Sequence, residues 1–182
     1  MYWNERGQAM TEQTACCAIE RATQLGIEHV VVASNSGYTA DFFLGRVAKL
    51  IVVTHHSGFR EPGHQELPDD VRRRLEVGGA RVLTTTHLFA NIERSVTNKF
   101  GGLYPGGLVA ATLRLFGQGV KVCLEVATMA LDAGMVPYGR EIIAVGGSGR
   151  GADTAMVVKP AHSNAFFDGQ VLELICKPRQ PR

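Results

Sequence analysis

The sequence predicts an α/β fold in which a mainly parallel sheet is covered by helices on both faces. Short β-branched runs, such as 30–33 and 50–53, alternate with segments whose apolar residues recur at helical spacing. This alternation is typical of βαβ units, whose strands run parallel. At 182 residues the chain is long enough for one well-buried domain and short for two, so we expect a single domain over 1–182.

The first elements are clearly marked. Residues 1–3 form a short strand or a docked aromatic anchor. A helix is expected over 11–25, because alanine, isoleucine and leucine recur at helical spacing and Gly26 is a typical helix stop. The β-branched run 30–33 predicts a strand buried on both faces, and a helix over 38–46 follows it.

The pattern then repeats. The apolar run 50–53 predicts a strand, and the long loop 54–65 that follows has no apolar periodicity. A helix over 68–77 opens with proline at its first position and two aspartates in its first turn. A strand over 81–84 and a weakly signalled helix over 86–97 complete this half.

The next segment is helical. A break rich in glycine and proline over 99–107 precedes expected helices over 108–116 and 120–133. Polar side chains recur on one stripe of this region, and we interpret the stripe as facing solvent rather than as carrying a buried functional glutamate. Its members are Arg114, Gln118, Lys121, Glu125 and Asp132.

The last third is rich in strands. Residues 141–145, 154–159 and 171–176 each have a strand pattern, and the first two are joined by the short glycine loop 146–153. Two successive strands with so short a connection are most simply antiparallel. We therefore expect this end of the chain to add a reversed strand at the edge of the sheet.

Composition and charge exclude several classes of partner. With 45% hydrophobic and 20% charged residues and a mean hydropathy of +0.01, the chain is typical of soluble globular proteins and contains no span suited to a membrane. The net charge of +2 favours no partner, and the arginine run 72–74 lies among acidic residues, so we expect no nucleic acid. The sequence leaves a homo-oligomer open.

The four cysteines show no CxxC spacing and follow no secretory leader, so we expect buried, reduced thiols in a cytoplasmic protein. They are Cys16, Cys17, Cys123 and Cys176.

The first candidate site follows the strand over 30–33. The small, polar, hydroxyl-rich loop leaves the first N–H groups of the next helix unpaired, which makes a potential phosphate cradle. The alternative is an ordinary turn in which a hydroxyl of Ser36 or Thr39 caps the helix. The candidate residues are Ser34, Asn35, Ser36, Gly37, Tyr38 and Thr39.

The second candidate is the glycine loop 146–153. Its spacing matches a loose dinucleotide fingerprint, but a strand rather than a helix follows, so we reject a Rossmann site. Glycines here allow backbone N–H groups to approach an anion, and Arg150 can grip a phosphate. The alternative is a hairpin turn with a solvent-exposed arginine. The candidate residues are Gly147, Ser148, Gly149, Arg150 and Gly151.

The third candidate is the histidine-containing loop 54–65. Its spacing matches no standard zinc pattern, so we expect no metal site. His55 and His56 are adjacent, so at most one faces a pocket, where it can donate a hydrogen bond or act as a general acid. The sequence shows no convincing nucleophile with a partner base.

Together these segments resemble a known family. VVASNSGYTA at 31–40 is similar to the effector-phosphate loop of the pyruvate kinase C-terminal domain, and FGGLYP at 100–105 is similar to a segment of the same domain. The chain resembles more closely the stand-alone archaeal and bacterial pyruvate kinase alpha/beta domain proteins. The shared segments are GFREPG at 58–63, FGQGVK at 116–121 and GRGADT at 149–154.

The resemblance implies a three-layer α/β/α sandwich with a mixed sheet of about five strands, one of them antiparallel. The catalytic barrel of pyruvate kinase has no counterpart in these residues, so we expect no pyruvate kinase activity. The resemblance also implies that flavin mononucleotide (FMN) is the ligand, with a possible flavin-dependent redox role. The first loop would hold its phosphate and the glycine loop would close over it. Residues near the ring would be Thr54, His55, Gly58 and Phe59.

The alternative to a flavin protein is a regulatory module that senses a sugar phosphate or nucleotide. A flavin needs an apolar slot, which Phe59, Phe100 and Tyr104 can supply. A sugar bisphosphate needs a second cationic grip, for which the sequence suggests only Arg150. We therefore favour the flavin.

Overall fold

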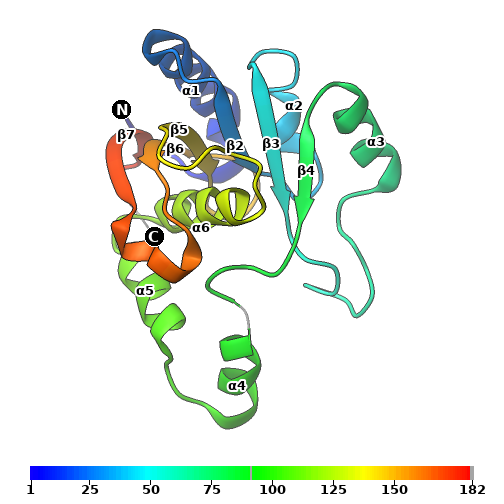
Figure 1. Cartoon of the computed structure of the whole chain (residues 1–182), viewed down its shortest axis with the longest axis vertical. Coiled ribbons are helices and arrows are strands. Elements are labelled where there is room, and N and C mark those ends of the chain that lie inside the picture. Colours follow the sequence, from blue (N-terminus) through cyan, green and yellow to red (C-terminus); the bar gives the residue numbers. More distant parts are fainter. Residues whose placement is uncertain (91, 181–182) are drawn as a thin grey trace.

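The computed structural model describes residues 1–90 and 92–180, and all its strands join one sheet. Across that sheet the strands follow the order β1-β7-β6-β5-β2-β3-β4 (Figure 1). The elements are β1 (Tyr2–Trp3), a 3-10 turn (Gly7–Met10), α1 (Thr11–Leu25), β2 (His29–Ala33), α2 (Tyr38–Asp41), β3 (Lys49–Thr54), α3 (Asp69–Val77), β4 (Arg81–Thr84), α4 (Ile92–Phe100), α5 (Pro105–Leu113), α6 (Gln118–Asp132), β5 (Ile142–Gly146), β6 (Thr154–Lys159), a 3-10 turn (Ser163–Asp168) and β7 (Gln170–Pro178).

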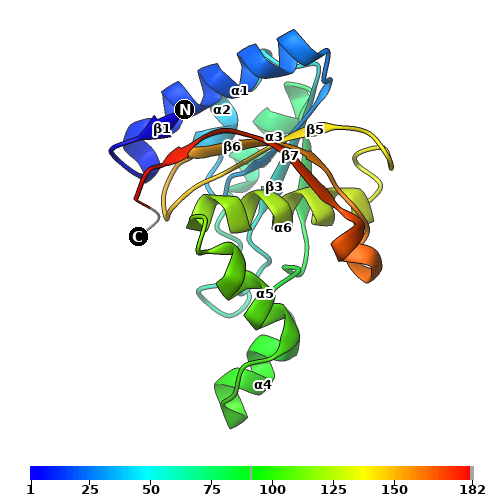
Figure 2. The same cartoon turned by 90° about the vertical axis from the view of Figure 1, so that its left-hand side faces the viewer.

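The three-layer α/β/α architecture is confirmed. Helices α1 and α6 lie on opposite faces of the sheet (Figure 2). Alternate residues of one strand point into the two cores: Val30 and Val32 pack on the side of α1, whereas Val31 packs on the side of α6. This explains why the run is apolar without interruption, as expected for a strand buried on both faces.

The sheet is mixed and mainly parallel, as predicted, but it differs in two details. Among the described residues it has seven strands rather than about five, because β7 pairs with β6 and the short β1 pairs with β7 in turn. The reversed strand is β6, which is antiparallel to both β5 and β7. The prediction of a reversed edge strand is therefore wrong: β7 covers β6, and β6 is internal.

Two helix boundaries also differ from the prediction. The helix expected over 38–46 ends at Asp41 and continues as turns, with Gly45 in the left-handed region. The helix expected over 86–97 instead spans Ile92–Phe100, and residue 91 lies outside the described residues. The remaining expected helices form within a few residues of their predicted bounds.

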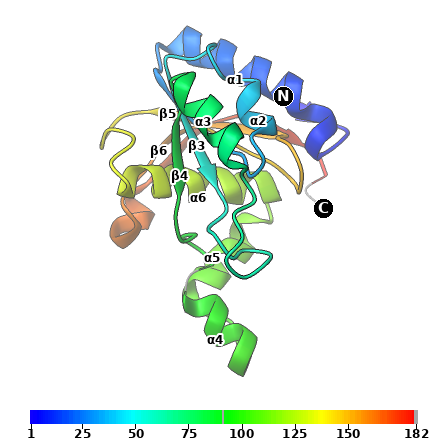
Figure 3. The ribbon, with the colours of Figure 1, turned by 90° about the vertical axis from the view of Figure 1, so that its right-hand side faces the viewer.

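Helices α4 and α5 project from the sheet as an arm (Figures 1 and 3). No described residue of α4 is buried, whereas α5 leads back to α6. The arm therefore adds little to the core, but it brings side chains of its own to the region beyond the carboxyl ends of the strands.

The cysteines are free thiols, but only some are buried as expected. Cys123 and Cys176 are buried, and burial raises the pKa of both thiols, that of Cys176 to about 11. Cys16 is exposed on the outer surface of α1, whereas Cys17 is half-buried and packs against the edge of the core. None of the helices described here has both the length and the apolar character needed to cross a bilayer.

Candidate functional site

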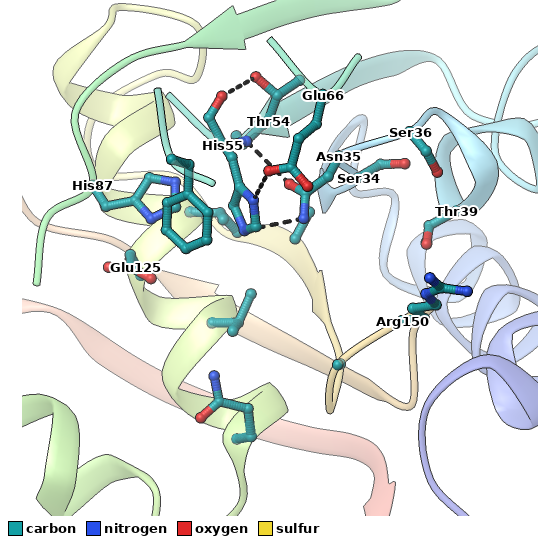
Figure 4. A pocket seen from close by; sticks show the side chains of 18 of the residues that line it. Ser34, Asn35, Ser36, Thr39, Thr54, His55, Glu66, His87, Glu125 and Arg150 are labelled. Atoms are coloured by element: carbon teal, nitrogen blue, oxygen red, sulfur yellow. Dashed lines mark hydrogen bonds and ion pairs between the residues drawn. The ribbon is translucent and has the colours of Figure 1, made fainter. Parts of the chain in front are cut away.

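A pocket of about 820 Å³ opens at the carboxyl ends of β2 and β3 (Figure 4). Ala33 and Thr54, which end those strands, line one wall, and α6 contributes another. The volume lies within the range of ligand sites in proteins, and the position is where open α/β sheets bind ligands. This pocket collects the three candidate segments of the sequence.

The loop after β2 places hydroxyl groups in the pocket. Ser36 and Thr39 line it, whereas the Ser34 side-chain oxygen accepts a hydrogen bond from the Ala40 N–H at 3.3 Å. The N-cap residue of α2 is Gly37, so neither Ser36 nor Thr39 caps the helix, and Ser34 accepts one of its N–H groups from outside it. Because α2 is a single turn, its dipole is small, and the hydroxyls and loop N–H groups remain as the main anion donors.

Gly37 and Asn35 have structural roles in this loop. Gly37 has a φ of 88°, and a Cβ there would overlap Val71, so the position requires glycine. The Asn35 side chain accepts the His55 backbone N–H at 3.0 Å and contacts the His55 ring Nε2 at 3.0 Å. Asn35 thus orients His55.

The glycine loop after β5 is fixed by Asp153. This buried carboxylate accepts hydrogen bonds from the backbone N–H of Gly7 at 2.8 Å and of Ser148 at 3.0 Å, and from the Thr154 hydroxyl at 2.7 Å. The loop is therefore tied to the N-terminal segment as well as to β6. No sequence signal pointed to this function of Asp153.

Arg150 extends from this fixed loop. It is exposed to solvent, yet it lines the pocket on the side where Ser36 and Thr39 lie (Figure 4). Within residues 1–90 and 92–180, no carboxylate forms an ion pair with it. The loop is therefore a hairpin turn, as one interpretation of the sequence expected. Its arginine is also available to bind an anion, as the other interpretation expected.

Four aromatic rings form a cluster toward the other end. His55 stacks on Phe59 with ring centroids 3.7 Å apart, and His87 lies 5.3 Å from His55. His56 touches the same rings but does not line the pocket, so the expectation that at most one of the pair faces it is confirmed. His55 Nδ1 lies 2.5 Å from a Glu66 carboxylate oxygen, which favours a proton on Nδ1.

The polar stripe of α5 and α6 lines this pocket, so its interpretation as solvent-facing is wrong. Lys121 and Glu125 are buried and form an ion pair. Burial lowers the pKa of Lys121 despite the opposing effect of Glu125, and the charges of Arg114 and Arg94 lower it further. Burial also lowers the pKa of His87, which faces Glu125 across the pocket.

The remaining stripe residues take different positions. The Arg114 Nε donates to the Gln118 side-chain oxygen at 2.8 Å, and both residues line the pocket. Asp132 lies at the far end of α6, where the Ser163 N–H donates to its carboxylate and His162 pairs with it. A backbone N–H, that of Phe89, donates to Glu125 at 3.0 Å and connects the α6 wall to the segment before α4.

Most predicted site residues line the pocket. These are Ser34, Asn35, Ser36, Tyr38, Thr39, Thr54, His55, Phe59, Gly147, Gly149, Arg150 and Gly151.

The exceptions are Gly37, Gly58 and Ser148, and neither Phe100 nor Tyr104 contributes to the lining, because the arm carries them away. Sequence reasoning missed several lining residues, for which the only signal was the charged stripe within an apolar region. The missed residues include Gln8, Arg60, Glu66, His87, Arg94, Arg114, Gln118, Lys121 and Glu125. Among the described residues, no cluster of three metal-ligating side chains occurs.

A sequence profile described as "Pyruvate kinase, alpha/beta domain" matches residues 12–158. Three crystal structures of pyruvate kinase from Cryptosporidium parvum are also similar. The first shares 17% identity over 82% of this chain with a TM-score of 0.43. A complex with ADP shares 18% over 75% with a TM-score of 0.38, and a third structure shares 17% over 78% with a TM-score of 0.39. This chain spans only about a fifth of those proteins, covering 20 to 22% of their length.

Proposed function

The chain belongs to the pyruvate kinase alpha/beta domain family, and from the chemistry of its pocket we propose that it binds a phosphorylated aromatic molecule, FMN. The observation that carries the proposal is the division of one pocket into a hydroxyl-and-arginine end and an aromatic end. Figure 4 shows Arg150, Ser36 and Thr39 at one side and His87 at the other, with His55 between them.

The phosphate end suits a phosphate monoester. Ser36 and Thr39 offer hydroxyl donors, the glycine loop offers backbone N–H groups, and Arg150 supplies a cation with no carboxylate of its own in the described chain. A guanidinium binds phosphate oxygens through two parallel charge-assisted hydrogen bonds. These groups would hold the phosphate of FMN.

The aromatic end suits a flat ring. Phe59 is 42% exposed although one side of its ring is stacked on His55, so apolar ring surface remains for a ligand. Asn35 and Glu66 fix His55 from two sides and hold this stack in place. Bound here, a flavin would supply electron and hydride transfer, while the chain would supply binding and orientation.

The first test is the visible absorbance of the purified, untagged protein, followed by mass analysis of what heat releases and by titration with added FMN. A flavin spectrum, or tight uptake of FMN, is expected. A colourless protein that takes up no FMN would contradict the proposal and favour a sugar-phosphate or nucleotide sensor.

The second test places a charge in the phosphate end. Ser36→Asp should weaken FMN binding more than a hundredfold, because like charges about 4 Å apart near a protein surface cost about 4 kcal/mol. Ser95→Asp, on the exposed surface of α4 and outside the pocket lining, is the matched control. Equal affinity of the two variants for FMN would refute the assignment of the phosphate end.

A further inference from the structure

The wall of the pocket formed by α6 and the arm carries an excess of positive charge. Arg94 comes from α4, Arg114 follows α5, and Lys121 lies on α6, so three separate elements bring cations to it. The two arginines are near enough to Lys121 for their charges to act on its ammonium group. Glu125 is the carboxylate that faces these cations from α6.

That carboxylate is already committed. Glu125 forms a buried ion pair with Lys121 and accepts the Phe89 N–H, so the two arginines keep their charge unbalanced. Arg114 uses Nε to reach the neutral Gln118 side chain, which leaves the outer face of its guanidinium free for another acceptor. In the described part of the chain, neither arginine has an ion-pair partner.

Lys121 is buried and Arg114 is half-buried, whereas Arg94 is exposed. Like charges near a buried ammonium group repel it, and a bound anion offsets that repulsion. A phosphate bound by Arg150 would lie away from the buried pair, because Figure 4 places Glu125, the ion-pair partner of Lys121, across the width of the pocket from Arg150. The wall beside the cations is apolar, since Val122, Val126 and Met129 of α6 line it. The ligand that suits both these cations and this apolar wall is thus an anionic group attached to a small carbon skeleton.

We propose that Arg94, Arg114 and Lys121 form a second anion subsite that binds the carboxylate of a small organic acid next to the aromatic end of the pocket. Guanidinium groups match the planar carboxylate through two parallel hydrogen bonds. The subsite deepens the proposed function, because an acid bound there lies beside the ring of FMN as a second substrate. Its own existence does not require that the first ligand be FMN.

The experiment measures binding of succinate to the purified protein by calorimetry, with and without saturating FMN, and uses uncharged succinamide as the neutral comparison. Succinate should bind and succinamide should not. Arg114→Gln should weaken succinate binding at least tenfold and FMN binding far less, and Arg94→Gln should act in the same direction. Arg73→Gln, on the exposed surface of α3 and outside the pocket lining, is the matched control and should bind as the unmodified chain does. Thermal unfolding of each variant checks that it is folded.

The outcomes separate the two proposals. Succinate binding that depends on Arg114 in a protein that takes up no FMN supports the subsite and contradicts the flavin assignment. Loss of FMN and succinate binding by the same factor, with each displacing the other, shows one ligand with two anionic groups and overturns a second molecule. Absence of succinate binding, or equal binding to Arg114→Gln and Arg73→Gln, overturns the subsite. Tighter Arg114-dependent binding of inorganic phosphate than of succinate, measured in the Ser36→Asp background, assigns a phosphate ester and overturns the carboxylate.

Discussion

Neutralising Glu125 should expose how much the pocket depends on its buried ion pair. The residues Lys121 and Glu125 are 6% and 4% exposed, so neither charge is well solvated. Glu125→Gln keeps the shape of the side chain and an oxygen that can accept the Phe89 N–H, and it removes only the charge. The ammonium of Lys121 is then buried without a counter-charge.

The expected cost is set by two limits. Removing one partner of a buried ion pair costs about 3 to 5 kcal/mol. The folded protein can avoid the buried charge by releasing the lysine proton, which at pH 7 costs about 4.6 kcal/mol, from a reference pKa of about 10.4 and 1.36 kcal/mol per pH unit. Urea unfolding at pH 7, without ligand, should therefore show a loss of about 3 to 4.6 kcal/mol.

The pH dependence of the stability of Glu125→Gln tests the buried charge more directly. In Glu125→Gln the folded-state pKa of Lys121 should fall further below its already lowered position. Between that pKa and about 10.4 the unfolded chain binds a proton that the folded chain does not, so stability should rise with pH by up to about 1.4 kcal/mol per unit. The unmodified chain should show a smaller rise from this lysine, because Glu125 stabilises its charge.

A double variant, Lys121→Met with Glu125→Leu, serves as the control, because it replaces the pair by apolar groups and leaves no buried charge. It should be more stable than Glu125→Gln, since a well-packed apolar pair often costs nothing. A loss below 1 kcal/mol in Glu125→Gln, or a double variant as unstable as the sum of its single changes, would refute the claim that the pair is both buried and coupled.

Three further predictions concern the surroundings of the pocket. Gly119→Ala should lower the free energy of unfolding in urea by about 1 to 3 kcal/mol, because the new Cβ overlaps the Thr154 hydroxyl. Gly107→Ala in α5 is the control and should be neutral or stabilising. Equal effects of the two changes would contradict the close packing of α6 on β6. Burial lowers the pKa of His87, so the stability that this neutral side chain contributes is complete above about pH 6.5 and is lost as pH falls below that value. Melting temperatures measured from pH 7.5 to 5.5 should therefore fall less steeply for His87→Asn than for the unmodified chain. Equal slopes would contradict the lowered pKa of His87. Asp153→Asn should lose about 1 to 3 kcal/mol and weaken FMN binding, because the neutral amide oxygen accepts the N–H groups of Gly7 and Ser148 less strongly than the carboxylate does and the amide NH2 cannot accept the Thr154 hydroxyl. Unchanged FMN affinity would show that the glycine loop does not depend on it.

The parts of the site that the sequence predicted are local. The strand, polar loop and helix around 30–40 form a pattern that depends on neighbours in the chain, and so does the hairpin around 146–153. The same reasoning predicted that at most one of His55 and His56 faces the pocket, since alternation along a strand is also local, and the structure shows that it is His55. These inferences needed no knowledge of what packs against the segment.

The α6 stripe shows why the rest could not be predicted. Spacings of three and four correctly place Gln118, Lys121 and Glu125 on one face of α6, but periodicity does not say whether water or protein covers that face. Here protein covers that face, because the loop 54–65, the segment before α4 and the arm lie over α6 and close the pocket above it. Asp153 was missed for the same reason, since one of its donors, Gly7, is 146 residues away.

The two ends of the pocket follow from this division between local and distant contacts. The phosphate end is made by loops that directly follow the paired strands β2 and β5, so its position is set by the sheet. The proposed second anion subsite takes Arg94 from α4, a helix in which no residue is buried, so this cation is held by fewer contacts. If both proposals hold, the phosphate of the first ligand is held by loops fixed to the sheet, whereas the second anion depends on a cation from an exposed helix. We therefore expect the second anion to bind more weakly than the first ligand.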